Sequence, residues 1–135
     1  MATPEFIVSL RQRIGHDMLW LPGVSIVVVD EAGRLLLGQR ADNGRWAVVS
    51  GIPEPGEQPA VAIRRECLEE TVVDVEVLAI TSVTAGEPFA FPNGDNCVFM
   101  DINFVGRARP GSADRAHVAD DESTQVGWFA PDALP

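Results

Sequence analysis

The sequence predicts an α+β fold in which helices pack on a mixed β-sheet. Extended, β-rich segments outnumber helical segments along the chain. Turn signals join several of the extended segments into hairpins, and one helical segment lies near the middle. With 135 residues, 46% hydrophobic and 22% charged, the composition matches one globular domain. We therefore expect residues 1–135 to form a single domain.

The first elements are expected to be a helix and a hairpin. Thr3 before Pro4 is typical of an N-cap, and apolar residues then recur at helical spacing, which predicts a helix over 4–14. Residues 24–29 and 35–37 are β-rich on either side of a short turn, which predicts two antiparallel strands.

The rest of the chain is predicted to contain one helix among short strands. A strand over 46–49 is followed by a loop rich in proline and glycine and by a helix over about 58–71. Residues 73–83 are β-rich, residues 98–105 show a two-residue alternation, and 126–129 form a last extended run. We expect all three segments to be strands.

Charge and cysteine usage limit the partners. Ten arginines, no lysine and twenty acidic residues give a net charge of −10, which would repel the backbone of a nucleic acid polymer. Cys67 and Cys97 are too few for a disulfide framework. The chain has neither a secretory signal nor a run of ~20 apolar residues. We therefore expect a cytoplasmic protein that binds neither a nucleic acid polymer nor a membrane.

The predicted central helix carries a cluster of carboxylates. Glu66, Glu69 and Glu70 stand at i, i+3 and i+4, so they share one helical face and repel one another. A hard divalent cation with oxygen ligands would offset this repulsion, and substrate phosphates could complete its coordination. The alternative is a solvated acidic face paired with neighbouring arginines.

This helix is expected to present its acids outward. Its packing face is expected to carry Ala60, Ile63 and Cys67. The preceding loop contains Gly51 and several prolines, and such a rigid turn can bring backbone groups close to a ligand.

The spacing of these residues resembles a known family signature. Gly51, Glu57 and the run Arg65-Glu66-Cys67-Leu68-Glu69-Glu70-Thr71-Val72-Val73 resemble the 23-residue Nudix box of MutT-like pyrophosphohydrolases. The resemblance extends over most of the chain, from the strand at Val24 to the strand at Trp128. Four positions depart from the pattern: Val72 stands in place of a glycine, Cys67 of an aliphatic residue, Ser50 of a glycine and Val49 of a proline.

The resemblance implies a mixed sheet sandwiched between helices and hydrolysis of a pyrophosphate bond. The implied substrate is a nucleoside diphosphate linked to a moiety X, and the implied cofactor is Mg²⁺ or Mn²⁺. The family's metal-site positions fall on Gly51, Glu57, Glu66, Glu69 and Glu70. Among them Gly51 would contribute its carbonyl, and Glu57 would support the site from the loop. Arg65 falls on the position that orients the glutamates.

A general base is also needed to activate water. Glu70 is one candidate, and Glu122 in the acidic loop Asp120–Glu122 is the other. That loop has an equally good interpretation as an exposed acidic turn. The predicted catalytic residues are Glu69, Glu70, Arg65 and Glu122.

Substrate contacts are predicted around the loop before the box. Arg40 and Arg45 could bind phosphate oxygens, and Trp46 and Phe89 could stack on a base. Surface solubility for the arginines and core packing for the aromatics are the competing interpretations. Asp101 and Asn103, on the polar face of their strand, could line the cleft or face water.

Two departures leave alternatives open. Val72 motivates a second hypothesis, a catalytically weak ligand-sensing or regulatory module. We expect Val72 to keep a negative φ because valine disfavours the left-handed region. Residues 131–134 resemble the start of a helix that the chain does not complete. We therefore expect an exposed apolar strip beside the last strand near Trp128, or a homodimer contact there.

Overall fold

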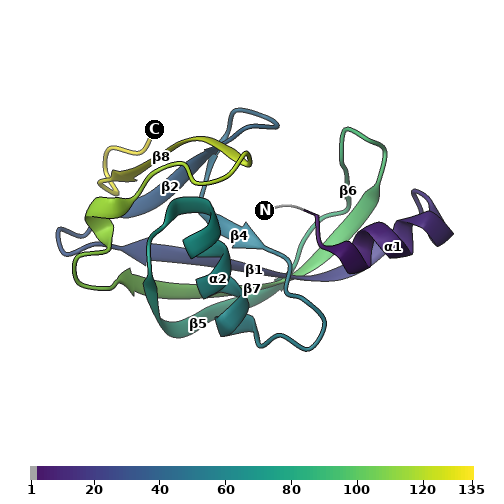
Figure 1. Ribbon diagram of the computed structural model, residues 1–135, viewed down its shortest axis with the longest axis horizontal. Coiled ribbons are helices and arrows are strands. Elements are labelled where there is room, and N and C mark those ends of the chain that lie inside the picture. The colour runs from purple at the N-terminus through teal and green to yellow at the C-terminus, as the bar shows by residue number, and fades with distance from the viewer. Residues whose placement is uncertain (1–2) are drawn as a thin grey trace.

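The computed structural model describes residues 3–135, which form one eight-stranded sheet with two α-helices and a short 3₁₀ segment (Figure 1). The elements are α1 (Glu5–Ile14), β1 (Leu19–Val29), β2 (Leu35–Arg40), β3 (Trp46–Ala47), β4 (Val49–Gly51), α2 (Pro59–Thr71), β5 (Val75–Ala85), β6 (Phe89–Ala90), β7 (Asn96–Ala108), η1 (Ala113–Arg115) and β8 (Ser123–Phe129). Parallel and antiparallel pairings both occur. The predicted α+β class with a mixed sheet is confirmed.

Strand β1 is the centre of the sheet. Along one side it pairs in parallel with β7, from Leu19 opposite Cys97 to Val29 opposite Arg107. Along the other side it pairs with β2 only at Val29 and with β4 at residues Val24 to Ile26. Strand β2 diverges from β1 to pair with β8.

The two helices pack on the sheet through two separate clusters of buried residues. On β7, Phe104 packs in the cluster beneath α2, whereas Cys97 packs in the cluster beneath α1. The main cluster includes the buried residues Val24, Ile26, Val28, Ala62, Ile63 and Cys67. The predicted mixed sheet with helices packed on it is therefore confirmed.

Most predicted elements are present with shifted ends. The first helix begins at Glu5, and its N-cap is Pro4 without a side-chain hydrogen bond, so the prediction of Thr3 as the cap is wrong. The predicted segment 46–49 is two short strands, β3 and β4, on different neighbours. Strand β6 was not predicted, since only two residues pair there. Both cysteines are buried free thiols, as expected.

The prediction of a negative φ at Val72 is wrong. Val72 ends α2 in the left-handed region with φ 63° and ψ 4°, and it is the only non-glycine residue with positive φ among residues 3–135. Its N–H donates to the carbonyl of Leu68 at 3.0 Å. The next residue, Val73, is fully buried in the core. The chain turns at Val72 because burying Val73 outweighs a local cost of roughly 1–2 kcal/mol.

The prediction of an exposed apolar strip beside Trp128 is also wrong. The Trp128 side chain packs against the main core cluster, and its Nε1 donates to the carbonyl of Ala113 at 2.9 Å. Large exposed apolar side chains lie instead on β5, at Leu78, Ile80 and Val83. Residues 130–135 form no helix. The alternative of a homodimer contact stays a prediction that sedimentation analysis can test.

Candidate active site

Two of the three clustered glutamates on α2 point into the protein. Glu66 is 1% exposed and Glu70 is 9% exposed, whereas the Glu69 side chain is 52% exposed. The expectation that the helix presents all its acids outward is therefore wrong, and Ala60, expected on the packing face, is exposed. Glu66 and Glu70 share the buried face with Ile63 and Cys67 because α2 lies over the junction between β4 and the core.

Arg65 connects the loop acid to the helix acids. Its Nε and Nη2 donate to the two carboxylate oxygens of Glu57, each at 2.8 Å. Its Nη1 lies 3.1 Å from Glu66 Oε1 and 3.3 Å from Glu69 Oε2. The hydrogen bonds from Arg65 lower the pKa of Glu57. One guanidinium thus fixes the positions of three carboxylates, which matches the orienting role that the resemblance implies.

Glu66 lies against Gly51 and keeps one unpaired oxygen. A Cβ at Gly51 would overlap the Glu66 carboxyl group, so only glycine allows this approach. Among residues 3–135, the buried Oε2 atom of Glu66 has no hydrogen-bond partner. Burial raises the pKa of Glu66 to about 7, against the opposing charge of Arg65. A buried carboxylate oxygen that accepts no hydrogen bond is energetically costly unless it binds a cation.

The loop after η1 brings further acids to the end of α2. The N–H groups of His117 and Ala119 donate to the carbonyls of Thr71 and Glu70, each at 3.1 Å. These bonds satisfy carbonyls at the helix C-terminus that have no partner within the helix. Burial, together with the nearby charges of Asp120 and Glu122, raises the pKa of Glu70 to about 7.

The donor set suits a hard divalent cation that also binds phosphate. Among residues 3–135, no three His, Cys, Asp or Glu side chains converge into a ready-made metal cage. Mg²⁺ in phosphate sites usually takes one or two carboxylates and fills its remaining positions with water and substrate oxygens. The unpaired Glu66 oxygen, the adjacent Gly51 and the buried Glu70 fit that pattern.

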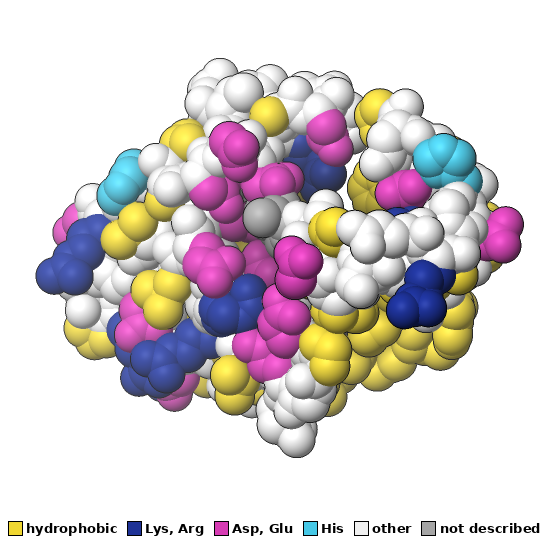
Figure 2. Space-filling model, turned by 45° about the vertical axis from the view of Figure 1, so that its right-hand side comes forward, with side chains coloured by type: hydrophobic (Ala, Val, Ile, Leu, Met, Phe, Trp, Pro, Cys, Tyr) yellow, Lys and Arg dark blue, Asp and Glu magenta, His cyan; other side chains and the backbone are white. Residues whose placement is uncertain are grey.

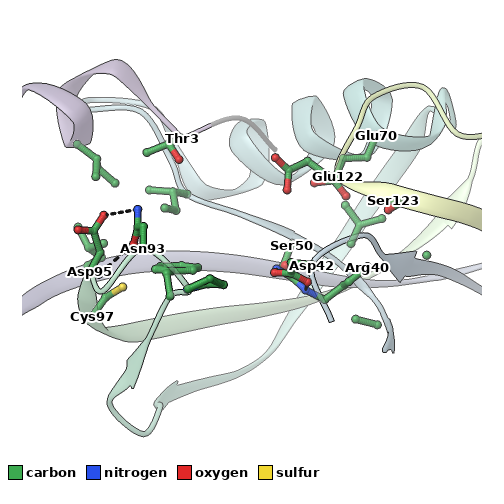
Figure 3. A pocket seen from close by; sticks show the side chains of 18 of the residues that line it. Thr3, Arg40, Asp42, Ser50, Glu70, Asn93, Asp95, Cys97, Glu122 and Ser123 are labelled. Atoms are coloured by element: carbon green, nitrogen blue, oxygen red, sulfur yellow. Dashed lines mark hydrogen bonds and ion pairs between the residues drawn. The ribbon is translucent and has the colours of Figure 1, made fainter. Parts of the chain in front are cut away.

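Two adjoining cavities open from this cluster. The first, of about 370 Å³, contains Glu70 and Glu122 at one end and Asn93 and Asp95 at the other (Figure 3). The second, of about 530 Å³, is lined by Gly51 and by aromatic residues near β6. Both are lined by Arg40, Asp42, Ser50, Ile52, Phe91 and Pro92. Figure 2 shows acidic side chains gathered around the middle of one face of the molecule.

The structure brings together only part of the predicted substrate set. Arg40 lines both cavities and forms a two-point ion pair with Asp42, whose shorter contact is 2.6 Å. The hydrogen bond with Asp42 raises the pKa of Arg40, as do the charges of Glu122 and Glu70. Phe89 lines the second cavity. Trp46 instead packs edge-to-face on Phe129, with ring centroids 5.0 Å apart.

Arg45 is exposed and lies outside the lining of both cavities. Asp42 and Ser50 line both cavities and were not predicted as site residues. The polar loop that follows Arg40 was the available signal for Asp42. For Ser50 the signal was its position beside Gly51.

Comparisons with known proteins agree with this geometry. A model of the NUDIX domain matches residues 19–135. A MutT-like protein from Streptomyces ambofaciens is 38% identical over 128 residues, covering 94% of this chain and 75% of that protein. The crystal structure of a MutT NUDIX hydrolase from Burkholderia pseudomallei superposes with a TM-score of 0.69 at 26% identity, covering 87% of this chain and 88% of that one. The chain belongs to the Nudix hydrolase family, a family of enzymes.

Other relatives carry more specific names. An 8-oxo-dGDP phosphatase of Mus musculus is 31% identical over 98% of this chain and 37% of that protein. An NAD-capped RNA hydrolase of Vibrio cholerae is 30% identical over 82% of this chain and 38% of that protein. The chain thus spans less than half the length of these two relatives. Within residues 3–135, no helix reaches the length and apolarity of a membrane span.

Proposed function

We propose that this protein hydrolyses a pyrophosphate bond in a nucleoside diphosphate linked to a moiety X, with Mg²⁺ or Mn²⁺ as cofactor. The observation that carries the proposal is the buried Glu66 oxygen without a partner, beside Gly51 and held by Arg65. A buried carboxylate oxygen without a donor is energetically costly, and a bound cation would offset that cost. The names of the relatives, an 8-oxo-dGDP phosphatase among them, support a nucleotide-type substrate.

The proposed roles are metal ligand, general base and phosphate contact. Glu66, Glu69, Glu70 and the Gly51 carbonyl are the proposed ligands, with Glu57 supporting them through Arg65. When bound, the cation would polarise the phosphoryl oxygens and lower the pKa of the attacking water. Glu70 or Glu122 would accept the proton of that water during in-line attack on phosphorus. Arg40, which lines both cavities, is positioned to meet the phosphates.

We further propose a small-molecule substrate rather than an RNA end, a cytoplasmic location, and one domain over residues 1–135. The net charge of −10 disfavours the long polyanion that an NAD-capped RNA hydrolase, such as the Vibrio cholerae relative, acts on. The sensing alternative loses its main support because Val72 adopts the left-handed conformation that a glycine would take there. The helix therefore ends as it would with glycine.

The test is a hydrolysis panel with each metal. Nucleoside triphosphates, nucleotide sugars, ADP-ribose, dinucleoside polyphosphates and a capped RNA would each be incubated with Mg²⁺, with Mn²⁺ and with chelator. We expect metal-dependent release of nucleoside monophosphate from at least one small substrate. Absence of turnover throughout, combined with ligand binding, would favour the sensing module, and preferential cleavage of the RNA would refute the small-molecule proposal.

A further inference from the structure

The second cavity contains a carboxylate without a protein partner. Asp101 on β7 lies opposite Gly23 on β1, and a Cβ at Gly23 would overlap its carboxylate. Gly86 also lies beside this carboxylate, with its Cβ position at an ordinary contact distance of 3.8 Å from Asp101 Oδ2. Among residues 3–135, no hydrogen bond or ion pair reaches the half-buried Asp101 side chain. Burial alone raises its pKa.

Asn103, the neighbour of Asp101 on the same face of β7, does have a hydrogen-bond partner in the protein. Asn103, two residues along β7 and on the same face, donates to Ser82 Oγ at 3.0 Å. Asn103 is thus satisfied within the protein, whereas Asp101 has both oxygens free to accept hydrogen bonds from a ligand. A partly buried acceptor pair of this kind indicates a ligand with two adjacent donors.

Aromatic rings form the wall beside Asp101. Phe89 stacks on Phe99 with centroids 5.7 Å apart and planes 24° apart, and it meets Phe91 edge-on at 4.9 Å. Phe89 remains 42% exposed, so part of its ring is open to the cavity that it lines. Exposed aromatic rings bind flat heterocycles by stacking.

We infer that the second cavity is a nucleobase subsite and that Asp101 selects a guanine-type base. The Watson–Crick edge of guanine offers two adjacent donors, the ring N1–H and the exocyclic amino group, which match a carboxylate accepting two hydrogen bonds. On that edge adenine has one donor beside one acceptor, and cytosine has one donor beside two acceptors, so each base would set a lone pair against the carboxylate. Uracil offers a single donor between two acceptors.

The position of the subsite agrees with the reaction proposed above, on which this inference rests for its phosphate end. The first cavity contains Glu70 and Glu122, and the second contains Asp101 and Phe89. Arg40 and Ser50 line both, so a nucleotide could place its phosphates near the glutamates and its base near Phe89 (Figure 3 shows the glutamate end).

The test uses nucleoside monophosphates, which contain no pyrophosphate bond and so report base binding without turnover. Titration calorimetry would measure GMP, IMP and AMP, where IMP lacks the exocyclic amino group of GMP. We expect GMP to bind at least about tenfold more tightly than AMP, with IMP between them. Parent protein that binds GMP and AMP within twofold of each other would overturn the inference.

Variants sharpen the test because an amide presents one donor and one acceptor. Asp101→Asn should lose the preference for GMP and gain affinity for AMP, whose edge matches an amide. Asp101→Ala should weaken GMP without favouring AMP. Asp114→Asn, which removes the same charge from the exposed η1 segment, serves as the control and should keep the parent's ratio. An unchanged GMP-to-AMP ratio in both Asp101 variants would refute the role of Asp101.

The two proposals fail separately. Selective GMP binding without hydrolysis of any substrate would reject the pyrophosphohydrolase and keep the base subsite. Metal-dependent hydrolysis with equal rates for guanine and adenine nucleotides would reject the subsite and keep the enzyme.

Discussion

At the scale of single residues, burial decides what each glutamate of α2 can do. Glu69 is mostly exposed and reaches Arg65, whereas Glu66 and Glu70 are enclosed and have their pKa raised to about 7. Such carboxyls are protonated more often than exposed ones near neutral pH, and a divalent cation would compete with those protons. Metal binding at the proposed site should therefore release protons.

Glu70→Gln tests the metal chemistry. The amide keeps the shape of the side chain but removes the charge that a hard cation needs. We expect turnover to fall by at least ~10²-fold, the scale of losing a well-placed catalytic group. The fold should persist because an uncharged side chain suits this buried position better than a carboxylate. A fully active variant in a steady-state assay would remove Glu70 from the site.

Glu122→Gln tests the acidic loop that leads into β8. Glu122 lines the first cavity, and its charge contributes to raising the pKa of Glu70. We expect a smaller but measurable loss of kcat, with metal affinity less affected than in Glu70→Gln. Equal activity to the parent would leave the chemistry to the helix alone. Glu31→Gln, in the exposed hairpin turn, is the matched control and should behave like the parent.

At the scale of elements, the end of α2 is held from several directions. Thr71 Oγ1 donates to the Cys67 carbonyl at 2.6 Å and accepts from the Val73 N–H at 3.2 Å. The loop after η1 adds the two hydrogen bonds that the backbone N–H groups of His117 and Ala119 donate to the end of α2. Together with the burial of Val73, these contacts impose a left-handed residue at position 72 even though valine disfavours it.

Val72→Gly should therefore relieve strain without changing the site. We expect the free energy of unfolding to rise by up to ~1 kcal/mol, because the lost strain exceeds the added backbone entropy of glycine in the unfolded chain. Denaturant titration would measure this change. Metal affinity, followed by calorimetry, should be nearly unchanged, since Glu66 to Glu70 precede the turn. Poor metal binding in the parent that the glycine variant restores would revive the sensing hypothesis.

At the scale of the whole molecule, the raised pKa values predict how stability depends on pH. Glu66 and Glu70 have an ordinary value of 4.5 and a folded value of about 7. Between these values the folded state holds more protons than the unfolded state, so the stability of the metal-free protein should fall as pH rises through this range.

Thermal melts with and without metal would check this dependence. Because Mg²⁺ or Mn²⁺ needs deprotonated carboxylates, the rise in Tm on adding metal should be larger at pH 8 than at pH 6. The double substitution Glu66→Gln, Glu70→Gln should flatten the metal-free pH dependence and abolish the metal effect. A metal effect that is equal at both pH values would contradict the assignment.

The sequence by itself determined the fold class, the central helix and the family. Periodicity and turn residues are local signals, and the spacing from Gly51 to Glu70 can be recognised without knowing how the chain packs. The sequence also indicated Glu122 and Phe89 as candidate site residues. It did so through residue type alone, and it indicated Arg45 and Trp46 in the same way, although both lie outside the two cavities.

Only the tertiary structure decided which side chains are enclosed and which are paired. Glu66 and Glu69 look equivalent along the helix, yet Glu66 is buried against Gly51, whereas Glu69 is half exposed and contacts Arg65. Val72 adopts a conformation against its own preference because Val73 must enter the core. Asp101 and Asn103 share a strand face, and only the position of Ser82 on β5 distinguishes the satisfied side chain from the free one. Burial and pairing depend on contacts between distant segments, which local patterns do not encode.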